Sequence, residues 1–423
     1  MLDQLALSRR SMLRALGAGS ALAALPGVGK LAFAGDANDH CLVVLFLRGG
    51  ADCLMLVGPS ADHTYVADRP PELRVLDSGD RQGLPLDNAL DPRLDFRLHP
   101  ELGPLAELYK QKQLAIVHAA GITDGTRSHF VAQDLIERGV AAEGDLARTG
   151  SGWLTRLLGA LPQHPNALVR AACTSGGVDA CLAGFGPALA VPELNGGTSL
   201  PGGDPTRSVL AALYRGGDDP LSRAMRNAVG TLTGLDQRLP RGADGKPTPY
   251  QPENQASYDG AESARGLRVI AQLLKMEVGL TLAAVDMGGW DTHEGQPGRF
   301  ANQARQLGLA LGAFWNDVAR YHDRVTVVVV TEFGRRLRAN KSEGTDHGHA
   351  SAMLVLGGTV NGGRMYGKWP GLNADALDHG VDLAVTTDYR TVFAEIAQRR
   401  FGAAPETVFP GFKPPAPLGL VRA

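Results

Sequence analysis

The sequence predicts an α/β fold in which helices cover both faces of a doubly wound, mostly parallel central sheet. Short apolar runs recur along the chain, and most of them end at glycine, as strands buried on both faces should. Helical patterns lie between these runs, and that alternation is typical of parallel strands joined by crossover helices.

Each element follows from its local pattern. Helices are predicted where apolar residues recur every three or four positions, at 99–111, 128–139, 263–277 and 299–322. The segment 382–402 begins with a strand or turn, starts a helix near Thr387 and Asp388, and ends at Gly402. Strands are predicted where apolar residues are continuous, at 41–50, 113–121, 278–289, 324–334 and 351–358.

Two stretches interrupt this order. Residues 184–206 are rich in glycine and proline, and residues 234–258 are polar, rich in proline and without a period. Because connecting segments run over the surface, we interpret both as insertions of one domain spanning residues 35–423, some of which cap the active face.

The first 34 residues have the pattern of a twin-arginine export signal. Arg9 and Arg10 precede an uncharged stretch at 15–29 that is too short to span a bilayer, and Ala32 and Ala34 form a small-x-small cleavage site. An amphipathic N-terminal helix is the alternative. We therefore expect the twin-arginine export machinery as a partner, a periplasmic or secreted location, and no membrane span in the mature protein.

Composition excludes several classes of function. The chain of 423 residues is 44% hydrophobic and 20% charged, which is typical of a globular protein with a large core. Its formal net charge of −2 is spread without long charged runs, so nothing favours nucleic acid or a membrane surface as a partner.

The four cysteines do not make a disulfide framework. Cys173 and Cys181 flank a Gly-Gly turn, and they either pair or remain buried free thiols. Cys41 and Cys53 flank a strand and are expected only to pack.

Metal-binding side chains gather where the predicted strands end. Ligands bind at the carboxyl ends of strands in such sheets, and carboxylate with imidazole suits zinc or manganese. A histidine in a loop is more often a surface or capping residue, but clustering at successive strand ends favours a metal site. Two Asp or His pairs spaced by two residues would each face one way on an extended segment. These side chains are Asp52, Asp286, Asp291, His293, Glu332, Asp346, His347 and His349.

Ser128 opens a predicted helix and has two interpretations. A serine at this position is by default an N-cap that binds its own backbone amides. A helix N-terminus also attracts anions, so Ser128, flanked by Arg127 and His129, is alternatively a nucleophile or an anion-binding residue. Asp52 and Arg48 have a structural alternative as well, as a loop cap and its ion-pair partner.

Several motifs together carry a family resemblance. They are LRGGAD, TRSHF, GGWDTH, TEFGR, GTDHGHASAMLVLGG and TTDYR. With them, nearly the whole mature chain resembles the exported bacterial family catalogued as domain of unknown function family 1501. That family is similar in turn to the alkaline phosphatase and sulfatase superfamily, which implies an alkaline phosphatase-like fold.

The resemblance also implies roles for individual residues. Asp52 would bind metal, Ser128 would be the nucleophile, and Asp291 and His293 would be further ligands. The remaining candidate ligands would be Glu332, Asp346, His347 and His349. One or two divalent ions are implied, with zinc as the first choice and manganese or calcium as alternatives.

These inferences predict a hydrolase that cleaves a small anionic phosphate or sulfate ester through a covalent seryl ester. Arg127 or Arg48 would neutralise the charge that develops in the transition state, and His129 or His293 would protonate the leaving group. The main alternative is an exported metal- or ligand-binding protein of the same fold without turnover. A metal-free esterase ranks last, because no Gly-x-Ser-x-Gly motif surrounds Ser128.

Overall fold

The computed structural model describes residues 40–164, 167–184, 188–194, 203–259 and 264–422. Residues 38–423 form one compact unit. The predicted export signal at 1–34 lies outside the described residues. Within the described ranges, no helix combines the length and the apolar character needed to cross a membrane.

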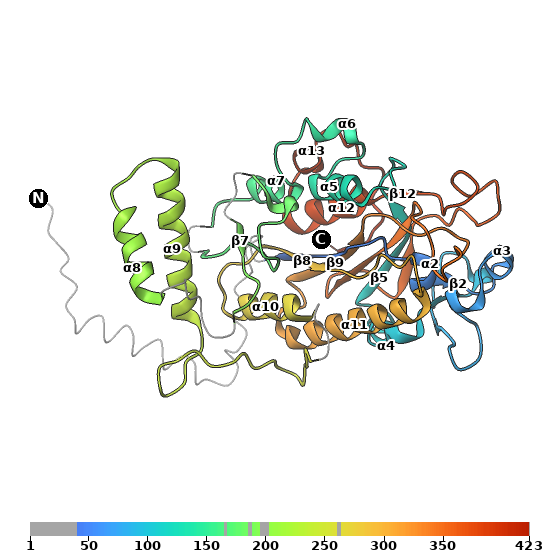
Figure 1. The fold of residues 1–423 in the computed structure, drawn as a ribbon, viewed down its shortest axis with the longest axis horizontal. Helices are drawn as coiled ribbons and strands as arrows, with labels where there is room; N and C mark the ends of the chain where they lie inside the picture. Colours follow the sequence, from blue (N-terminus) through green and yellow to red (C-terminus); the bar gives the residue numbers. More distant parts are fainter. Residues whose placement is uncertain (1–39, 165–166, 185–187, 195–202, 260–263, 423) are drawn as a thin grey trace, which may run out of the picture. The chain divides into compact units, whose positions relative to one another are not determined.

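A nine-stranded sheet forms the centre of the described part of this unit (Figure 1). Its strand order is β11-β5-β10-β9-β1-β8-β6-β7, and β12 pairs with β5. Strand β10 runs antiparallel to both of its neighbours, and the other pairings are parallel. The strands are β1 Cys41–Leu47, β5 Leu114–Gly121, β6 Ala171–Cys173, β7 Ala188–Ala190, β8 Leu282–Met287, β9 Val325–Thr331, β10 Ser351–Gly357, β11 Arg364–Tyr366 and β12 Thr387–Asp388. The predicted doubly wound, mostly parallel α/β class is confirmed.

Helices cover both faces of this sheet (Figure 1). Alternate residues of β1 point to opposite sides, so Val43 and Leu45 belong to one apolar core while Leu42 and Val44 belong to the other. The first core contains α4 Gly103–Lys110, α10 Ala264–Lys275 and α11 Gln296–Asp317, and the second contains α5 His129–Arg138, α7 Trp153–Ala160, α12 Tyr389–Phe401 and α13 Pro405–Val408. Burial on both faces explains why the strand sequences are continuously apolar.

Smaller elements complete the described part of the fold. A second, antiparallel sheet has the order β2-β4-β3, with β2 Val57–Pro59, β3 Leu84–Pro85 and β4 Phe96–Leu98. The short helices are α2 Cys53–Leu56, α3 His63–Asp68 and α6 Glu143–Leu146, with 3₁₀ turns at Pro71–Leu73, Pro92–Leu94, Pro100–Leu102, Ala180–Leu182 and Ala319–Tyr321.

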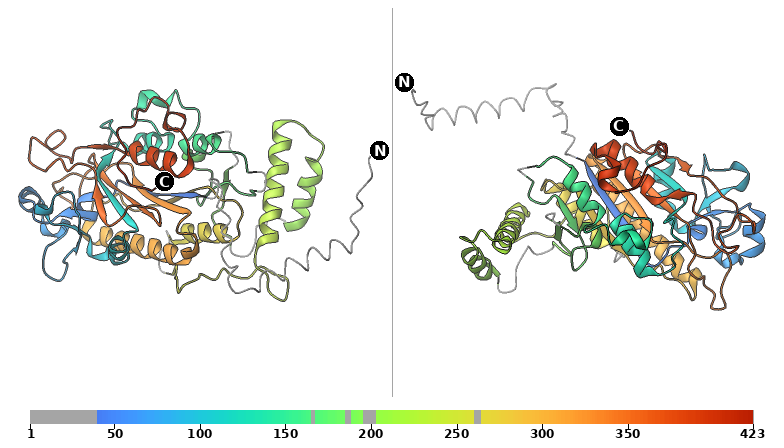
Figure 2. Two further views of the ribbon diagram at one scale, coloured as in Figure 1. Left: turned by 180° about the vertical axis from the view of Figure 1, so that it is seen from behind. Right: turned by 90° about the horizontal axis from the view of Figure 1, so that it is seen from above.

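Helices α8 (Gly203–Leu213) and α9 (Pro220–Arg238) lie side by side as a hairpin that the sequence reading did not predict (Figures 1 and 2). Helix α9 extends into the segment 234–258, whose sequence has no helical period. It ends before Pro240, whose ring disfavours helical geometry in the preceding residue. Few side chains of this hairpin are buried.

Asp317, at the end of α11, accepts hydrogen bonds from the rest of that proline-rich segment. The carboxylate of Asp317 is fully buried and accepts hydrogen bonds from the hydroxyls of Tyr250 and Tyr258 at 2.7 and 2.8 Å. Lys275 of α10 supplies the compensating charge at 2.5 Å. The segment is therefore anchored to the helical layer at a buried ion pair.

The four cysteines are buried free thiols. Of the two alternatives for Cys173 and Cys181, the structure shows the unpaired one.

Topology determines which loops meet. Strands β5, β9, β1 and β8 run in one direction, so the loops after them emerge at the same edge of the sheet. Because β10 runs in the opposite direction, the long loop 332–350 between β9 and β10 remains at that edge.

Candidate metal centre

Four side chains from three of these loops meet at the carboxyl edge of the sheet. His129 begins α5, Asp291 and His293 follow β8, and His347 precedes β10. Ligand atoms of His129, Asp291 and His347 all lie within 4.8 Å of one another. The Nε2 atom of His293 lies 2.8 Å from Nε2 of His347 and 3.1 Å from Oδ1 of Asp291. We call these four residues the His₃Asp cluster.

Hydrogen bonds to the outer ring nitrogens define where the histidine protons are. Nδ1 of His347 lies 2.8 Å from the carbonyl oxygen of Arg127, and Nδ1 of His129 lies 2.7 Å from a carboxylate oxygen of Glu332. Nδ1 of His293 lies 3.3 Å from a carboxylate oxygen of Asp346. Because these oxygens only accept, we assign the proton of each neutral ring to Nδ1. Each Nε2 then presents a lone pair to the cluster.

The four atoms that face the centre of the cluster are therefore all acceptors, and one of them, Oδ1 of Asp291, accepts a hydrogen bond from Arg335 at 2.5 Å. Nε2 of His129 is buried and has no hydrogen-bond partner, although Oδ1 of Asp291 lies 3.5 Å away. Oδ1 of Asp291 lies 3.4 Å from Nε2 of His347. Tetrahedral zinc with bonds of about 2.0–2.1 Å would separate its ligand atoms by roughly 3.3 Å. Three imidazoles and one carboxylate at these separations fit a divalent cation.

Charge in and around the cluster favours the ligand form of these groups. Burial alone would raise the pKa of Asp291, but the hydrogen bond to Arg335, the charge of Arg335 and the charges of His293 and His129 together outweigh it and hold the pKa at about 2. Burial lowers the pKa of His347, which keeps that ring neutral. The hydrogen bond to Glu332 raises the pKa of His129 and makes its Nε2 a stronger base.

Glu332 supports the cluster instead of belonging to it. Its side chain is fully buried, and Oε1 accepts from the backbone N–H of Gly49 at 2.9 Å and the amide of Gln133 at 2.8 Å, besides His129. Burial alone would raise the pKa of Glu332, but these hydrogen bonds lower it, so the carboxylate stays charged. Carboxylates behind ligating histidines fix the ring and strengthen the metal bond.

Replacing this carboxylate tests that supporting role. Because Glu332→Gln removes the charge behind His129 at nearly constant shape, we expect zinc affinity to fall by about 10- to 100-fold. Zinc titration against a competing chelator measures the change, with Glu107→Gln on the exposed side of α4 as the control. Equal affinity in the Glu332 variant and the wild type would contradict the assignment.

A buried arginine holds three loops at the site together. The guanidinium of Arg335 is fully buried and donates to the carbonyl oxygens of Gly49, Gly50 and Thr345 at 2.5, 2.9 and 2.8 Å. It also donates to Asp291 at 2.5 Å. Gly49 has a φ of 122°, and a Cβ there would lie 2.3 Å from the backbone nitrogen of Asp291, so only glycine allows this approach.

Ser128 lies directly before His129 at the N-cap position of α5. Its side chain is exposed and makes no capping hydrogen bond, so the default role of such a serine is not seen. The hydroxyl is therefore exposed and free of a capping bond, one residue before a member of the His₃Asp cluster. Phe130, on the first turn of the same helix, is 90% exposed and offers an apolar surface two residues after Ser128.

Asp52 is not brought to the cluster. Its Oδ1 accepts from the backbone N–H groups of Leu54 and Met55 as the N-cap of α2. Its Oδ2 pairs with the buried Arg69 and accepts from Gln296 at 2.6 Å. We therefore do not retain Asp52 as a ligand, because both oxygens already have partners in the core.

Asp346 and His349, two other predicted ligands, also lie outside the His₃Asp cluster. Asp346 lies behind His293, accepts from Asn340 at 3.2 Å, and supports that ring in the way Glu332 supports His129. His349 faces away from the cluster, with Nδ1 2.9 Å from Asp378 and Nε2 2.9 Å from the carbonyl oxygen of Ile122. Neither atom of His349 is free to bind a metal in this conformation.

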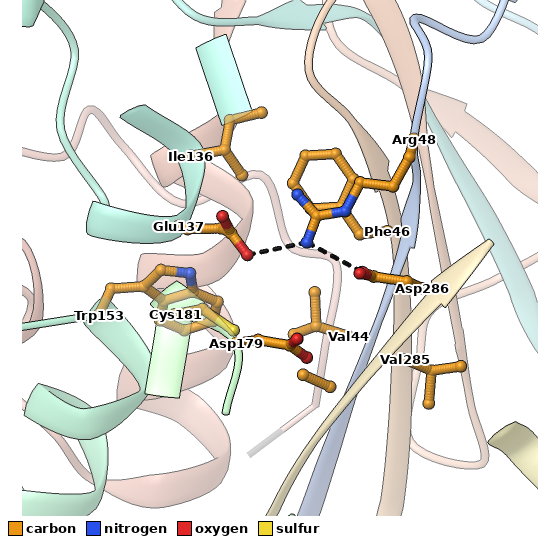
Figure 3. Close-up of a pocket in the computed structure, with 11 residues that line it drawn as sticks. Val44, Phe46, Arg48, Ile136, Glu137, Trp153, Asp179, Cys181, Val285 and Asp286 are labelled. Atoms are coloured by element: carbon orange, nitrogen blue, oxygen red, sulfur yellow. Dashed lines mark hydrogen bonds and ion pairs between the residues drawn. The ribbon is translucent and has the colours of Figure 1, made fainter. Parts of the chain in front are cut away.

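The two arginines predicted to neutralise substrate charge are already paired. The guanidinium of Arg127 contacts Asp378 and Asp382, and only its carbonyl oxygen reaches the cluster, through His347. Arg48 lies 2.8 Å from Glu137 and 2.9 Å from Asp286, beside a cavity of ≈ 10 Å³ that has room for about one water molecule (Figure 3). Neither guanidinium is retained as a catalytic group.

Sequence reasoning missed two residues of the site and assigned a different role to a third. His129 was predicted as a catalytic group and instead lies among the candidate ligands. Arg335 and Gln133 were not predicted at all. The spacing of Gln133 four residues after His129 is a signal for a shared helix face, whereas nothing in the sequence marks a buried arginine.

The fold and this cluster together define an α/β protein with a candidate divalent-metal centre at the carboxyl edge of its sheet. Residues 118–408 match the family model described as protein of unknown function DUF1501, which is more than half of the chain. The chain belongs to this family. No curated protein matches it.

Several solved structures are similar to the chain at low scores. The C-terminal periplasmic domain of EcEptC from Escherichia coli, in complex with Zn, has 8% identity and a TM-score of 0.33, over 76% of this chain and 74% of that one. The alkaline phosphatase from the Antarctic bacterium TAB5 has 9% identity and a TM-score of 0.31, over 75% of this chain and 91% of that one. Each similarity is weak, and the α/β class of this protein is defined by its own strand order.

Proposed function

We propose that this protein is an exported, metal-dependent hydrolase that cleaves phosphate or sulfate esters through Ser128. The observation that carries the proposal is the convergence of four acceptor atoms from His129, Asp291, His293 and His347, of which the Asp291 oxygen also accepts a hydrogen bond from Arg335. Zinc is the proposed ion, because imidazole with carboxylate suits it and a tetrahedral set matches the separations.

The side chains around the cluster have complementary tasks in this proposal. A divalent ion held by His129, Asp291, His293 and His347 would supply Lewis-acid charge to the ester oxygens. Outer partners, namely Glu332, Asp346 and the carbonyl oxygen of Arg127, keep each Nε2 directed inward. The exposed ring of Phe130 provides a contact for the organic part of an ester.

The reaction proceeds in two balanced steps. In the first, Oγ of Ser128 forms a bond to the phosphorus or sulfur atom while the bond to the ester oxygen breaks, and the hydroxyl proton ends on the departing alcohol. In the second, water attacks the seryl ester, releases phosphate or sulfate, and restores the hydroxyl. The exposure of Ser128 and its freedom from capping support this role.

The Ser128→Ala variant tests the nucleophile. Because no other group can form the seryl ester, we expect kcat for phosphate and sulfate mono- and diesters to fall by at least about 10³-fold. The zinc content of the variant should equal that of the wild type. Steady-state assays of zinc-loaded protein measure the effect, and Ser78→Ala, at an exposed serine outside the site, is the control.

Two outcomes would contradict the proposal. Turnover retained in Ser128→Ala would exclude the serine as nucleophile. If zinc binds and the wild type cleaves no ester in the panel, the alternative of a metal-binding protein without turnover replaces the hydrolase.

The remaining parts of the proposal concern location. The N-terminal pattern around Arg9 and Arg10 supports export by the twin-arginine machinery to the periplasm or beyond. Proteins exported by that route are already folded, which suits a protein that loads its metal before export.

A further inference from the structure

We infer that Gln133 is a positioning residue of the metal centre and that Arg48 sets the orientation of its amide. The inference rests on the proposed zinc site and goes beyond it, because neither side chain belongs to the His₃Asp cluster. Gln133 lies one turn after His129 on α5, so both side chains leave the same face of the helix. The amide of Gln133 contacts Glu332, and Glu332 contacts the outer nitrogen of His129.

The amide of Gln133 lies between a carboxylate and a guanidinium. Its nitrogen lies 2.8 Å from Oε1 of Glu332, and its oxygen lies 3.4 Å from a terminal nitrogen of Arg48. Because a charged carboxylate can only accept and a guanidinium can only donate, both neighbours require the same orientation of the amide. The opposite orientation would place two acceptors together on one side and two donors together on the other. Glu332 therefore receives its donor at a fixed position.

Arg48 can set this orientation because other groups hold its guanidinium in place. A terminal nitrogen lies 2.8 Å from Glu137 and 2.9 Å from Asp286, and the central carbon lies 4.0 Å from the centre of the Phe46 ring (Figure 3). Glu137 lies one further turn along α5, on the same face as Gln133. The guanidinium therefore presents its other terminal nitrogen toward the amide in a constant direction.

The carboxylate that receives this donor is the one that holds the ring of His129. Glu332 is fully buried, and its Oε1 accepts from the backbone N–H of Gly49 at 2.9 Å as well as from Gln133 and His129. Loss of the amide would remove one of these three donors and give the carboxylate more freedom to turn. Because an outer partner fixes the ring of a ligating histidine, this change reaches the metal through Nε2 of His129.

The Gln133→Met variant tests the role of the amide. Methionine has a similar length but can neither donate to Glu332 nor accept from Arg48 as an amide does, so we expect zinc affinity to fall by about 10-fold. Competition with a chelator measures the affinity. Cobalt(II) in place of zinc absorbs visible light in bands that depend on ligand geometry, and these bands should shift. Asp134→Asn, at the next position of α5, is the control and should change neither measurement, because its carboxylate pairs with Arg138.

A double-mutant cycle separates positioning through Glu332 from a general loosening of the fold. Gln133→Met combined with Glu332→Gln should lower zinc affinity little more than Glu332→Gln alone, because the amide acts on the metal through that carboxylate. Losses that multiply in the double variant would mean that Gln133 supports the site by another route, and would overturn the inference.

The Arg48→Lys variant tests the role of the guanidinium. Lysine keeps a positive charge for Glu137 and Asp286 but lacks the fork whose second nitrogen faces the amide. We expect zinc affinity to fall by about 3-fold in the wild-type background and to stay unchanged in the Gln133→Met background. An equal loss in both backgrounds would overturn the claim that Arg48 acts through Gln133.

Failure of this inference is distinguishable from failure of the proposed function. Unchanged zinc affinity in Gln133→Met overturns the positioning role alone. If the wild type binds zinc but cleaves no ester, the hydrolase fails, while the zinc affinities of the variants still decide the role of Gln133. A wild type that binds no zinc overturns the metal site and the positioning role together.

Discussion

Replacing His347 by alanine is expected to abolish tight zinc binding. Nε2 of His347 lies 2.8 Å from Nε2 of His293 and 3.4 Å from Oδ1 of Asp291. Loss of this ring therefore leaves one side of the ligand set open. Loss of an outer partner alone typically costs 10- to 100-fold in metal affinity, and loss of a ligand should exceed about 100-fold. Metal analysis after dialysis, together with chelator competition, measures the effect.

The matched control is His349→Ala, two residues along the same loop. His349 is similarly half-buried, but both of its ring nitrogens are bonded elsewhere, to Asp378 and to the carbonyl oxygen of Ile122. This variant should keep full zinc stoichiometry even if its melting temperature falls. Zinc lost from His349→Ala and kept by His347→Ala would mean that the wrong histidine has been placed in the cluster.

Thermal melting gives an independent measure of the same binding. A ligand that binds only the native state at 100 times its Kd stabilises it by about 2.7 kcal/mol. Wild-type protein should therefore melt at a higher temperature with zinc than with a chelator. In His347→Ala the two melting curves should coincide.

The fold was largely predictable because its strands are buried on both faces. Residues 327–330 of β9 are four consecutive valines, and such a run is typical of a strand in the centre of a sheet. The direction of β10 was not predictable from its own sequence, because an antiparallel strand buried on both faces has the same apolar pattern. That direction matters, since it keeps the loop 332–350 at the functional edge.

The residue types of the site could be predicted from the sequence. Which of these residues are ligands and which support the ligands could not. Spacing by two residues predicted that each pair would face one way. This is true of Asp291 and His293, which both reach the cluster, and wrong for His347 and His349. The second pair flanks Gly348, which packs so closely on Arg335 that a Cβ would lie 2.5 Å from its carbonyl carbon. The loop turns there, and no local sequence pattern indicates the direction in which the imidazole rings of His347 and His349 point.

Arg335→Met should destabilise the protein by about 3–5 kcal/mol, because it leaves three buried carbonyl oxygens without a donor and also removes the ion pair with the half-exposed Asp291. The guanidinium donates to the carbonyl oxygens of Gly49, Gly50 and Thr345 and to Asp291, and methionine can replace none of these bonds. Arg335→Lys should rescue little, since an ammonium group cannot match the fork geometry of four directed bonds. Denaturant unfolding of the zinc-free proteins measures the change.

Arg338→Met provides the comparison, with the same substitution three residues farther along the chain. Arg338 is 59% exposed and forms a surface ion pair with Asp68, so its loss should cost less than about 1 kcal/mol. If both variants unfold at the same denaturant concentration, Arg335 does not hold the loops together. A large difference between them would mean that the loops carrying Gly49, Asp291 and Thr345 owe their convergence to one buried charge, and that the cluster depends on a residue that itself need bind no metal.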